Sequence, residues 1–353
     1  MESSRVQELR RILLSTLTSN NDSAILLSGG LDTSIITDLG HESLKIAHAY
    51  TLLTGPTNTA TDETFAKTIA NSHSIPHTII RIPNTLDLVS DSPSSPLSLC
   101  VKVLNTFDPM ELRNSVVVAR TLQECAANNV KTVITGDGAD ELFAGYSFLS
   151  TLSPGKLRRW IHRISQNMSF SVVPLSKALG IENVIQPFLH PDVIQFALTC
   201  KKSELVGTCP ETGKPLGKWI LREAFPEAHS CWRRKDPIEV GSGTTHLPKL
   251  FETLYDAEEV EREKARIWDE DRIQIRDAEH LHYYRIFRRT FWKEDSEGRK
   301  WECGVERYGS DPCRSCGFQL QRPDQYFCVV CGEWPAREGG LPEDVEDGDD
   351  LDG

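Results

Sequence analysis

Two apolar segments of this chain run directly into turns rich in glycine and acid, and this repeated arrangement restricts the fold more than any other sequence feature. The first segment, Ala24 to Leu27, is followed by SGGLDTS (28–34). The second, VKTVI (130–134), is followed by TGDGADELFAGY (135–146). A short apolar run that ends in such a turn predicts a buried strand whose end carries a polar loop.

The neighbouring segments alternate between the two kinds of periodicity. Helical spacing over TSIITDLG (33–40) and DETFAKTIANSHSI (62–75) alternates with the strand-like stretches KIAHAYTLL (45–53) and HTIIRI (77–82). This alternation predicts an α/β fold with a doubly wound parallel sheet.

Composition divides the rest of the chain. The proline- and serine-rich residues 83–100 predict a loop, and SVVVARTLQECAANN (115–129) predicts a helix. The segment 149–254 is helical and loop-rich, and the dense charge of 256–292 predicts one or two exposed helices. We therefore expect an N-terminal helix (1–22), a large α/β domain with a helical C-terminal half (23–292), a small cysteine-rich segment (293–335) and an acidic disordered tail (336–353).

The first loop has the composition of a phosphate site. Gly29 and Gly30 allow a tight turn with open N–H groups, and the following helix directs its positive end there. Ser28, with the hydroxyls of 33–34, adds donors, and Asp32 beside a phosphate indicates Mg²⁺.

The second loop carries three acids, Asp137, Asp140 and Glu141. Ligands of open α/β sheets bind beyond the carboxyl ends of the strands, so both loops predict one Mg²⁺–nucleotide site. Taken singly, each loop has a plainer explanation: Asp32 as a helix cap, and the second loop as a surface turn or a Ca²⁺ loop without EF-hand spacing. Their shared position at strand ends favours the nucleotide site.

These motifs resemble a known family. SGGLDTS resembles the pyrophosphate-binding loop of the PP-loop ATPases, whose fold is PP-loop/HUP-like, and TGDGADELFAGY is similar to the synthetase domain of glutamine-dependent asparagine synthetases and their relatives, including the β-lactam synthetases. The resemblance continues through DETFAKTIA, DPMELRNS, LGIENVIQPFLHP, GKWILREAF and CWRRKDP to AEHLHYYRIFRRTF. It implies an asparagine synthetase-like ATP-binding domain over residues 23–292. The implied activity is that of an AMP-forming amide ligase, which uses ATP–Mg²⁺ to activate a small-molecule carboxylate as an acyl-adenylate for attack by ammonia or an amine.

The resemblance also implies roles for individual residues. Those that would hold the pyrophosphate or nucleotide are Ser28, Gly29, Gly30, Asp32, Thr33, Ser34 and Gly136. Asp32 and Asp140 would bind Mg²⁺, Asp137 matches the acid linked to acylation, and Glu141 would support the substrate end. Lys235, which alone would be read as a surface lysine, matches the lysine that stabilises charge on the phosphates.

Three features depart from the family. The chain reaches the first loop within 30 residues of Met1, so we expect no glutaminase domain, and nitrogen would come from ammonia, an amine on the substrate, or a partner such as a separate glutaminase. The family has the stretch Glu-x-Arg-x-Pro-Phe-Leu-Asp, and this chain has Asn183, Ile185 and His190 at its three charged positions. The change of Arg to Ile removes a guanidinium that could bind a carboxylate through two hydrogen bonds, which predicts altered acceptor recognition. Thr33 in place of serine is neutral.

The cysteines suggest a second metal. Of ten cysteines, four form the pattern Cys313-x₂-Cys316 and Cys328-x₂-Cys331, with eleven residues between the pairs and a glycine after each. Without a secretion signal, this spacing predicts a structural Zn²⁺ ribbon rather than disulfides, unpaired cysteines or a redox pair, with Cys303 outside it. We expect the ribbon to contact protein or brace the fold.

Charge separates the remaining classes of function. The chain has 39 basic and 51 acidic residues, a net charge of −12, with seven acids in residues 343–353. This argues against nucleic-acid binding, and no apolar run is long enough to span a bilayer, so we expect a cytoplasmic protein, with the nucleus left open. Two alternatives stay open: a PP-loop tRNA-modifying enzyme, and a non-catalytic ATP-binding scaffold acting through its ribbon.

Overall fold

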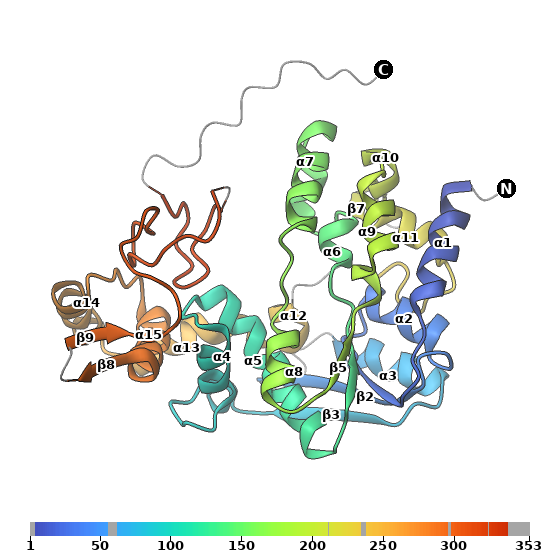
Figure 1. Cartoon of the computed structure of the whole chain (residues 1–353). Helices are drawn as coiled ribbons and strands as arrows, with labels where there is room; N and C mark the ends of the chain where they lie inside the picture. Colours follow the sequence, from blue (N-terminus) through green and yellow to red (C-terminus); the bar gives the residue numbers. More distant parts are fainter. Residues whose placement is uncertain are drawn as a thin grey trace. The chain divides into compact units, whose positions relative to one another are not determined.

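The computed structural model describes residues 4–55, 62–210, 212–233, 238–295, 298–323 and 325–337 (Figure 1). The chain forms two compact units: Met1–Pro83 with Thr121–Gly243, and Asn84–Arg120 with Thr244–Gly353. Both units are assembled from separate stretches of sequence. The division into four consecutive segments, with boundaries near residues 22, 292 and 335, stays a prediction. Most of the expected acidic tail lies outside the described residues.

The first unit contains a five-stranded sheet in the order β3-β2-β1-β4-β5, in which every neighbouring pair is parallel. Its strands are β1 (Ser23–Leu26), β2 (Ile46–Thr54), β3 (His77–Ile82), β4 (Thr132–Ile134) and β5 (Asn183–Ile185). From β1 the chain moves outward to β2 and β3, and it then returns to β4 and β5 on the other side. The predicted α/β, doubly wound parallel sheet is confirmed.

Helices of this unit flank the sheet. They are α1 (Ser4–Thr16), α2 (Leu31–Gly40), α3 (Asp62–Ser72), α6 (Ala139–Leu142), α7 (Pro154–Ser165), α8 (Val172–Ala178), α9 (Pro191–Leu198), α10 (Lys202–Leu205), α11 (Trp219–Ala224) and α12 (Ile238–Ser242), with 3₁₀ turns η2 (Ser147–Thr151) and η3 (Pro187–Leu189) and the hairpin β6 (Val206–Thr208) and β7 (Pro215–Gly217). Connections between parallel strands are right-handed, so the face on which a connecting helix lies depends on the direction in which the chain moves along the sheet. This direction reverses after β3, which assigns α2 and α3 to one face of the sheet and α8, which contacts β5, to the other.

A continuous apolar core supports the sheet. Ile25 of β1, Ile134 of β4 and Ile35 of α2 are completely buried in it. The N-terminal helix α1 contributes Leu9 and Leu13, both fully buried, and it contacts α9 and α11. Each Å² of apolar surface removed from water stabilises the folded state by about 25 cal/mol, so this core holds the elements of the first unit together.

The second unit is mostly helical. It contains η1 (Thr85–Asp87), α4 (Pro96–Leu104), α5 (Pro109–Ala127, as far as Arg120), η4 (Thr244–His246), α13 (Leu247–Leu254), α14 (Ala257–Asp271), α15 (Ala278–Phe291) and the hairpin β8 (Trp292–Asp295) with β9 (Gly298–Trp301). Phe287 of α15 lies at its aromatic centre, with ring centroids 4.9 Å from Phe107, 5.6 Å from Trp301 and 5.9 Å from Phe318. The predicted helical C-terminal half is confirmed.

Two local predictions for this unit were wrong. The loop expected over residues 83–100 ends earlier, because Ser95 caps α4 by accepting the Ser98 N–H at 3.0 Å and Pro96 occupies the first turn. The exposed helices expected over 256–292 include α15, yet Tyr283 and Tyr284 of this helix are completely buried. Within the described residues, no helix has the length and apolar character needed to cross a bilayer.

Candidate active site

The two glycine- and acid-rich loops leave the sheet at neighbouring positions. β1 and β4 pair in parallel with Ile25 opposite Ile134, so the loops that follow them begin at the same edge. This is also the point at which the strand order reverses. In open α/β sheets, ligands bind outside the carboxyl ends of the strands at such a switch point.

Glycine is required at the tip of the first loop. Gly29 has φ +70, and a Cβ there would lie 2.6 Å from the backbone nitrogen of Ala66 and 2.7 Å from Cβ of Phe65. Gly30 then forms the N-cap of α2 without a side-chain cap. The turn therefore lies against α3, and the first N–H groups of α2 are left without a side-chain acceptor from the cap.

The three hydroxyls of this loop point to different partners. Ser28 Oγ accepts the Gly30 N–H at 3.2 Å and lies 3.3 Å from Thr33 Oγ1, so both hydroxyls belong to the loop itself. Ser34 is completely buried, and its hydroxyl donates to Asp38 at 2.7 Å. Ser34 thus anchors α2 from behind, and the phosphate contacts predicted for the three hydroxyls stay predictions.

One lysine joins the acids of the two loops. Nζ of Lys218 lies 2.7 and 2.6 Å from the two carboxylate oxygens of Asp32 and 2.7 Å from Oδ1 of Asp140. The three side chains are only 4, 15 and 12 % exposed. The two carboxylates thus converge on the ammonium group of Lys218. Carboxylate oxygens arranged in this way also suit Mg²⁺ as ligands.

Sequence reasoning missed Lys218, although it lies in the quoted stretch GKWILREAF. It precedes α11 with a left-handed backbone, φ 58, and is 3 % exposed. A buried lysine needs an anionic partner, so the useful signal was a lysine directly before three apolar residues, Trp219 to Leu221.

Glycines also permit the close approach of these side chains. A Cβ on Gly136 would lie 2.9 Å from Cβ of Asp32, and one on Gly145 would overlap Oδ1 of Asp140 and lie 2.6 Å from Cε of Lys218. The predicted nucleotide residue Gly136 therefore lies directly beside the first loop. Any larger residue at either glycine would push the acids away from the lysine.

Asp137 is buried beside this cluster. Its Oδ2 accepts hydrogen bonds from Thr135 Oγ1 at 2.6 Å and from Gln186 Nε2 at 2.9 Å. Burial raises the pKa of its carboxyl, and the negative charges of Asp32 and Asp140 raise it further, against the two hydrogen bonds. Gln186 follows β5 directly, and sequence reasoning passed over it.

Glu141 lies on α6, one residue after Asp140. It accepts a 2.5 Å hydrogen bond from the hydroxyl of Tyr146. Burial raises the pKa of Glu141, and the neighbouring charge of Asp140 adds to this effect. The second loop thus holds two carboxyl groups that bind protons more tightly than exposed acids do.

Lys235 lies outside the described residues, but the segment that leads to it is anchored. Arg233 donates to Asp62 Oδ1 at 2.6 Å and to the carbonyl oxygen of Ser28 at 3.2 Å, and its side chain is 6 % exposed. The guanidinium also lies 4.3 Å from the ring centroid of Phe65. The chain two residues before Lys235 is therefore fixed to the first loop.

Comparison with known proteins identifies the family. The family model described as asparagine synthase matches residues 7–182, which include both loops. This chain contains an asparagine synthase domain.

Curated relatives extend this similarity. The glutamine-hydrolyzing asparagine synthetase of Sandersonia aurantiaca is 25% identical over 307 residues, covering 80% of this chain and 55% of that protein. A probable glutamine-hydrolyzing asparagine synthetase of Schizosaccharomyces pombe is 24% identical over 265 residues, covering 65% and 45%. The chain spans about half the length of the curated relatives it matches.

A solved structure is also similar. The U34-tRNA thiolase NcsA from Methanococcus maripaludis, with its 4Fe-4S cluster, has a TM-score of 0.32 and 13% identity, covering 80% of this chain and 78% of that one.

The four cysteines predicted to bind zinc lie together in the second unit. Their sulfur atoms are all within 4.8 Å of one another, and the residues are Cys313, Cys316, Cys328 and Cys331, each at most 2 % exposed. The two halves are built alike, because Gly317 and Gly332 both have positive φ and donate to the carbonyls of the first cysteine in each pair. This predicted four-cysteine cluster is confirmed, Cys303 lies outside it, and zinc as the bound metal stays a prediction.

The cysteine segment is bound to its own unit. Phe107 N–H donates to the carbonyl of Val330 at 2.8 Å, Thr106 Oγ1 donates to that of Val329 at 2.8 Å, and Gln274 N–H donates to that of Ser315 at 2.9 Å. These contacts favour a bracing role over that of an independent module.

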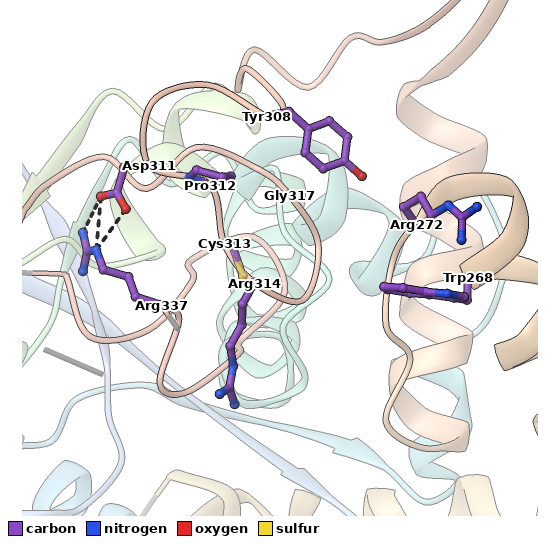
Figure 2. Close-up of a pocket in the computed structure, with 9 residues that line it drawn as sticks. All are labelled: Trp268, Arg272, Tyr308, Asp311, Pro312, Cys313, Arg314, Gly317 and Arg337. Atoms are coloured by element: carbon purple, nitrogen blue, oxygen red, sulfur yellow. Dashed lines mark hydrogen bonds and ion pairs between the residues drawn. The ribbon is translucent and has the colours of Figure 1, made fainter. Parts of the chain in front are cut away.

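A hollow beside Cys313 is lined by aromatic and charged side chains. Figure 2 shows Trp268 and Arg272 on one side of it and the ion pair between Asp311 and Arg337 on the other. Arg337 binds both oxygens of Asp311, with its shortest contact at 2.6 Å. Arg314 pairs with Glu333 at 2.6 Å, so two of the three arginines that line the hollow form ion pairs within the cysteine segment.

Proposed function

We propose that the asparagine synthase domain is an ATP-dependent, AMP-forming carbon–nitrogen ligase. It would activate a small-molecule carboxylate as an acyl-adenylate, which ammonia or an amine then attacks to give an amide and AMP. The observation that carries this proposal is the convergence of Asp32 and Asp140 on Lys218 at the switch point of the sheet. A degenerate scaffold has no need to keep two acids and a lysine together in a mostly buried site.

The residues fit Mg²⁺ and a nucleotide. Asp32 and Asp140 supply the carboxylate oxygens that Mg²⁺ prefers, and the ion would neutralise charge on the pyrophosphate oxygens. Gly29 and Gly30 turn the backbone so that the N–H groups at the start of α2 are available to phosphate oxygens. Lys218 holds the two carboxylates at one point and keeps a positive charge beside them.

Asp137 and Glu141 are the proposed groups at the substrate end. Burial raises the pKa of both carboxyl groups, so each can hold a proton closer to neutral pH than an exposed acid can. We place Asp137 at the acylation step and assign Glu141 to support of the substrate. Lys235 would act on the phosphates, since Arg233 fixes the preceding chain to the first loop.

The carboxylate itself is proposed to differ from aspartate. Ile185 ends β5 beside the second loop, and its neighbour Gln186 donates to Asp137. His190 caps α9 by accepting the Asp192 N–H at 3.3 Å, and its side chain is about half exposed. The aliphatic side chain of Ile185 thus stands where the family has a guanidinium, which favours a less polar acid.

The nitrogen donor is proposed to be free ammonia, an amine on the substrate, or a partner such as a separate glutaminase. We further propose that Zn²⁺ occupies the four-cysteine cluster and that the protein is cytoplasmic. The bracing contacts of the cysteine segment support a structural rather than a catalytic zinc.

Pyrophosphate release tests the ligase directly. The full chain would be incubated with ATP, Mg²⁺ and ammonium, first with aspartate and then with a panel of aliphatic and aromatic acids. Asp32→Ala and Asp140→Ala serve as blanks, and Asp192→Ala, on the exposed start of α9, serves as a matched acidic control. We expect release that depends on one class of acid and is lost in both blanks.

A second arm separates the ligase from the remaining alternatives. Unmodified tRNA replaces the carboxylate panel in the same assay. Release with tRNA alone would replace the ligase with a tRNA-modifying enzyme. ATP binding without release under any condition, with or without a glutaminase and glutamine, would favour the scaffold.

A further inference from the structure

A second group of metal-ligand side chains lies in the first unit, behind the phosphate loop. Among the described residues, only this group and the four-cysteine cluster bring three or more such side chains within 4.8 Å of one another. The three side chains are Asp38 near the end of α2, His73 just after α3, and His229 in the loop after α11. They are far apart in sequence, so only the fold brings them together.

The two imidazole rings converge on one carboxylate oxygen of Asp38. Nε2 of His73 lies 2.7 Å and Nδ1 of His229 lies 2.8 Å from Oδ1 of Asp38. The second oxygen, Oδ2, accepts the hydroxyl of Ser34 at 2.7 Å and the backbone N–H of His229 at 2.8 Å. Oδ2 thus fixes the orientation of the carboxylate, while Oδ1 faces two imidazole nitrogens.

The charge at this position calls for a cation. The Asp38 side chain is 4 % exposed, and in the described part of the chain it forms ion pairs with His73 and His229. Its oxygen Oδ1 faces two imidazole nitrogens at 2.7 and 2.8 Å, and a cation bound by these three atoms would place a positive charge beside the buried carboxylate. A divalent ion bound between them would require Nε2 of His73 and Nδ1 of His229 as free lone pairs, so each ring would carry its proton on its other nitrogen.

We propose that Asp38, His73 and His229 form a binding site for a transition-metal dication such as Zn²⁺. Two imidazoles and one carboxylate are a common donor set for such ions, and they leave at least one position for water. Side-chain exposures of 16 % for His73 and 37 % for His229 provide access from solvent. The ring of His41 lies 4.2 Å from that of His73 and supports its orientation.

The site would connect to the first loop. Ser230, next to His229, donates its hydroxyl to the carbonyl of Gly29 at 2.7 Å, and its N–H donates to Oγ of Ser34 at 3.1 Å. An ion held by α2 and His229 would therefore fix the segment after α11 against the back of the loop. This inference does not depend on the ligase activity, because it concerns metal binding alone.

Metal counting tests the proposal. The full chain would be stripped of metal, titrated with Zn²⁺ and analysed for bound equivalents after desalting. We expect two equivalents in the wild type, one in His73→Gln, one in His229→Gln and one in Cys316→Ser. His162→Gln, an exposed histidine on α7, is the matched control and should keep two.

Co²⁺ absorption spectra and amide exchange rates measure two effects that a histidine with a purely structural role would not change. Co²⁺ should fill a site with weak visible bands in addition to the intense thiolate bands of the four-cysteine cluster, and only the former should vanish in His229→Gln. Zn²⁺ should slow amide exchange over residues 228–231 about tenfold in the wild type and leave it unchanged in that variant. One equivalent in the wild type, or two in both histidine variants, would overturn the proposal.

Discussion

The ammonium of Lys218 lies 2.7 and 2.6 Å from the two carboxylate oxygens of Asp32, and both side chains are largely buried. Asp140 contacts the same nitrogen. Removal of the lysine would take away the cation that the two acids share. The penalty for an uncompensated buried charge exceeds the value of most single contacts.

Lys218→Met should therefore destabilise the chain by about 3 to 5 kcal/mol in Mg²⁺-free buffer, because two buried carboxylates lose their common partner. Urea unfolding with and without Mg²⁺ measures this. Mg²⁺ should recover more stability in the variant than in the wild type, since it can bind both acids. Lys67→Met, at an exposed pair with Glu63, should cost below about 1 kcal/mol. A Lys218→Met chain as stable as the wild type would contradict the shared-cation site.

Gly29→Ala should abolish nucleotide binding and lower stability. The left-handed backbone costs about 1 to 2 kcal/mol for a residue with a Cβ, and the contact with Ala66 adds to this. Gly180→Ala is a matched control, because Gly180 has φ +75 with nothing within 4 Å of an added Cβ. ATP-dependent thermal stabilisation measures binding, and equal losses in the two variants would reduce the role of Gly29 to backbone strain.

Cys316→Ser should remove one metal equivalent and lower the thermal midpoint of the second unit by several degrees. The cluster has few apolar side chains of its own, so the metal would supply much of its folding free energy. Cys303→Ser is the control, because Cys303 is also buried but lies outside the cluster. Atomic absorption with calorimetry measures both effects, and a chelator should reproduce the loss in the wild type.

Asp108→Asn should change how stability depends on pH. Burial raises the pKa of Asp108 to about 6 from its ordinary 3.8, so the folded chain holds this proton more tightly than the unfolded chain. The resulting stability is fully present below pH 3.8, falls as the pH rises to about 6, and is absent above that. The variant should lack this fall and be about 1 to 3 kcal/mol more stable at pH 7, because asparagine still accepts the Met110 N–H.

Denaturation between pH 3 and 8 measures this effect. Asp269→Asn, on the exposed face of α14, should follow the wild type throughout. Parallel curves for Asp108→Asn and the wild type would show that Asp108 titrates as an ordinary acid.

The parts of the site that sequence predicted are those set by local rules. Gly29, Asp32 and Asp140 lie directly after apolar runs, and the ends of neighbouring parallel strands meet at one edge. The four-cysteine cluster was predictable because its spacing and its glycines are local as well. The α/β fold followed from alternating periodicities in the same way.

The parts that sequence missed depend on contacts between distant residues. Lys218 reaches Asp32 across 186 positions, and His229 reaches Asp38 across 191. No spacing rule connects such residues, because the sheet and the loop after α11 bring them together. The burial of α15 was missed for a related reason. Its apolar stripe alone is what an exposed amphipathic helix would also show, and the ring of Phe318, which packs against Phe287, comes from 31 residues further along the chain.

The contacts between the cysteine segment and residues 106–108 have a consequence for inheritance. These residues lie within the stretch that matches the asparagine synthase family, yet the Phe107 N–H and the Thr106 hydroxyl donate to carbonyl groups of 329–330. A gene fusion or recombination event that exchanged one part without the other would leave the Phe107 amide and the Thr106 hydroxyl without these acceptors. Residues 106–107 and 329–330 should therefore have been constrained to change together, although they lie in different parts of the sequence.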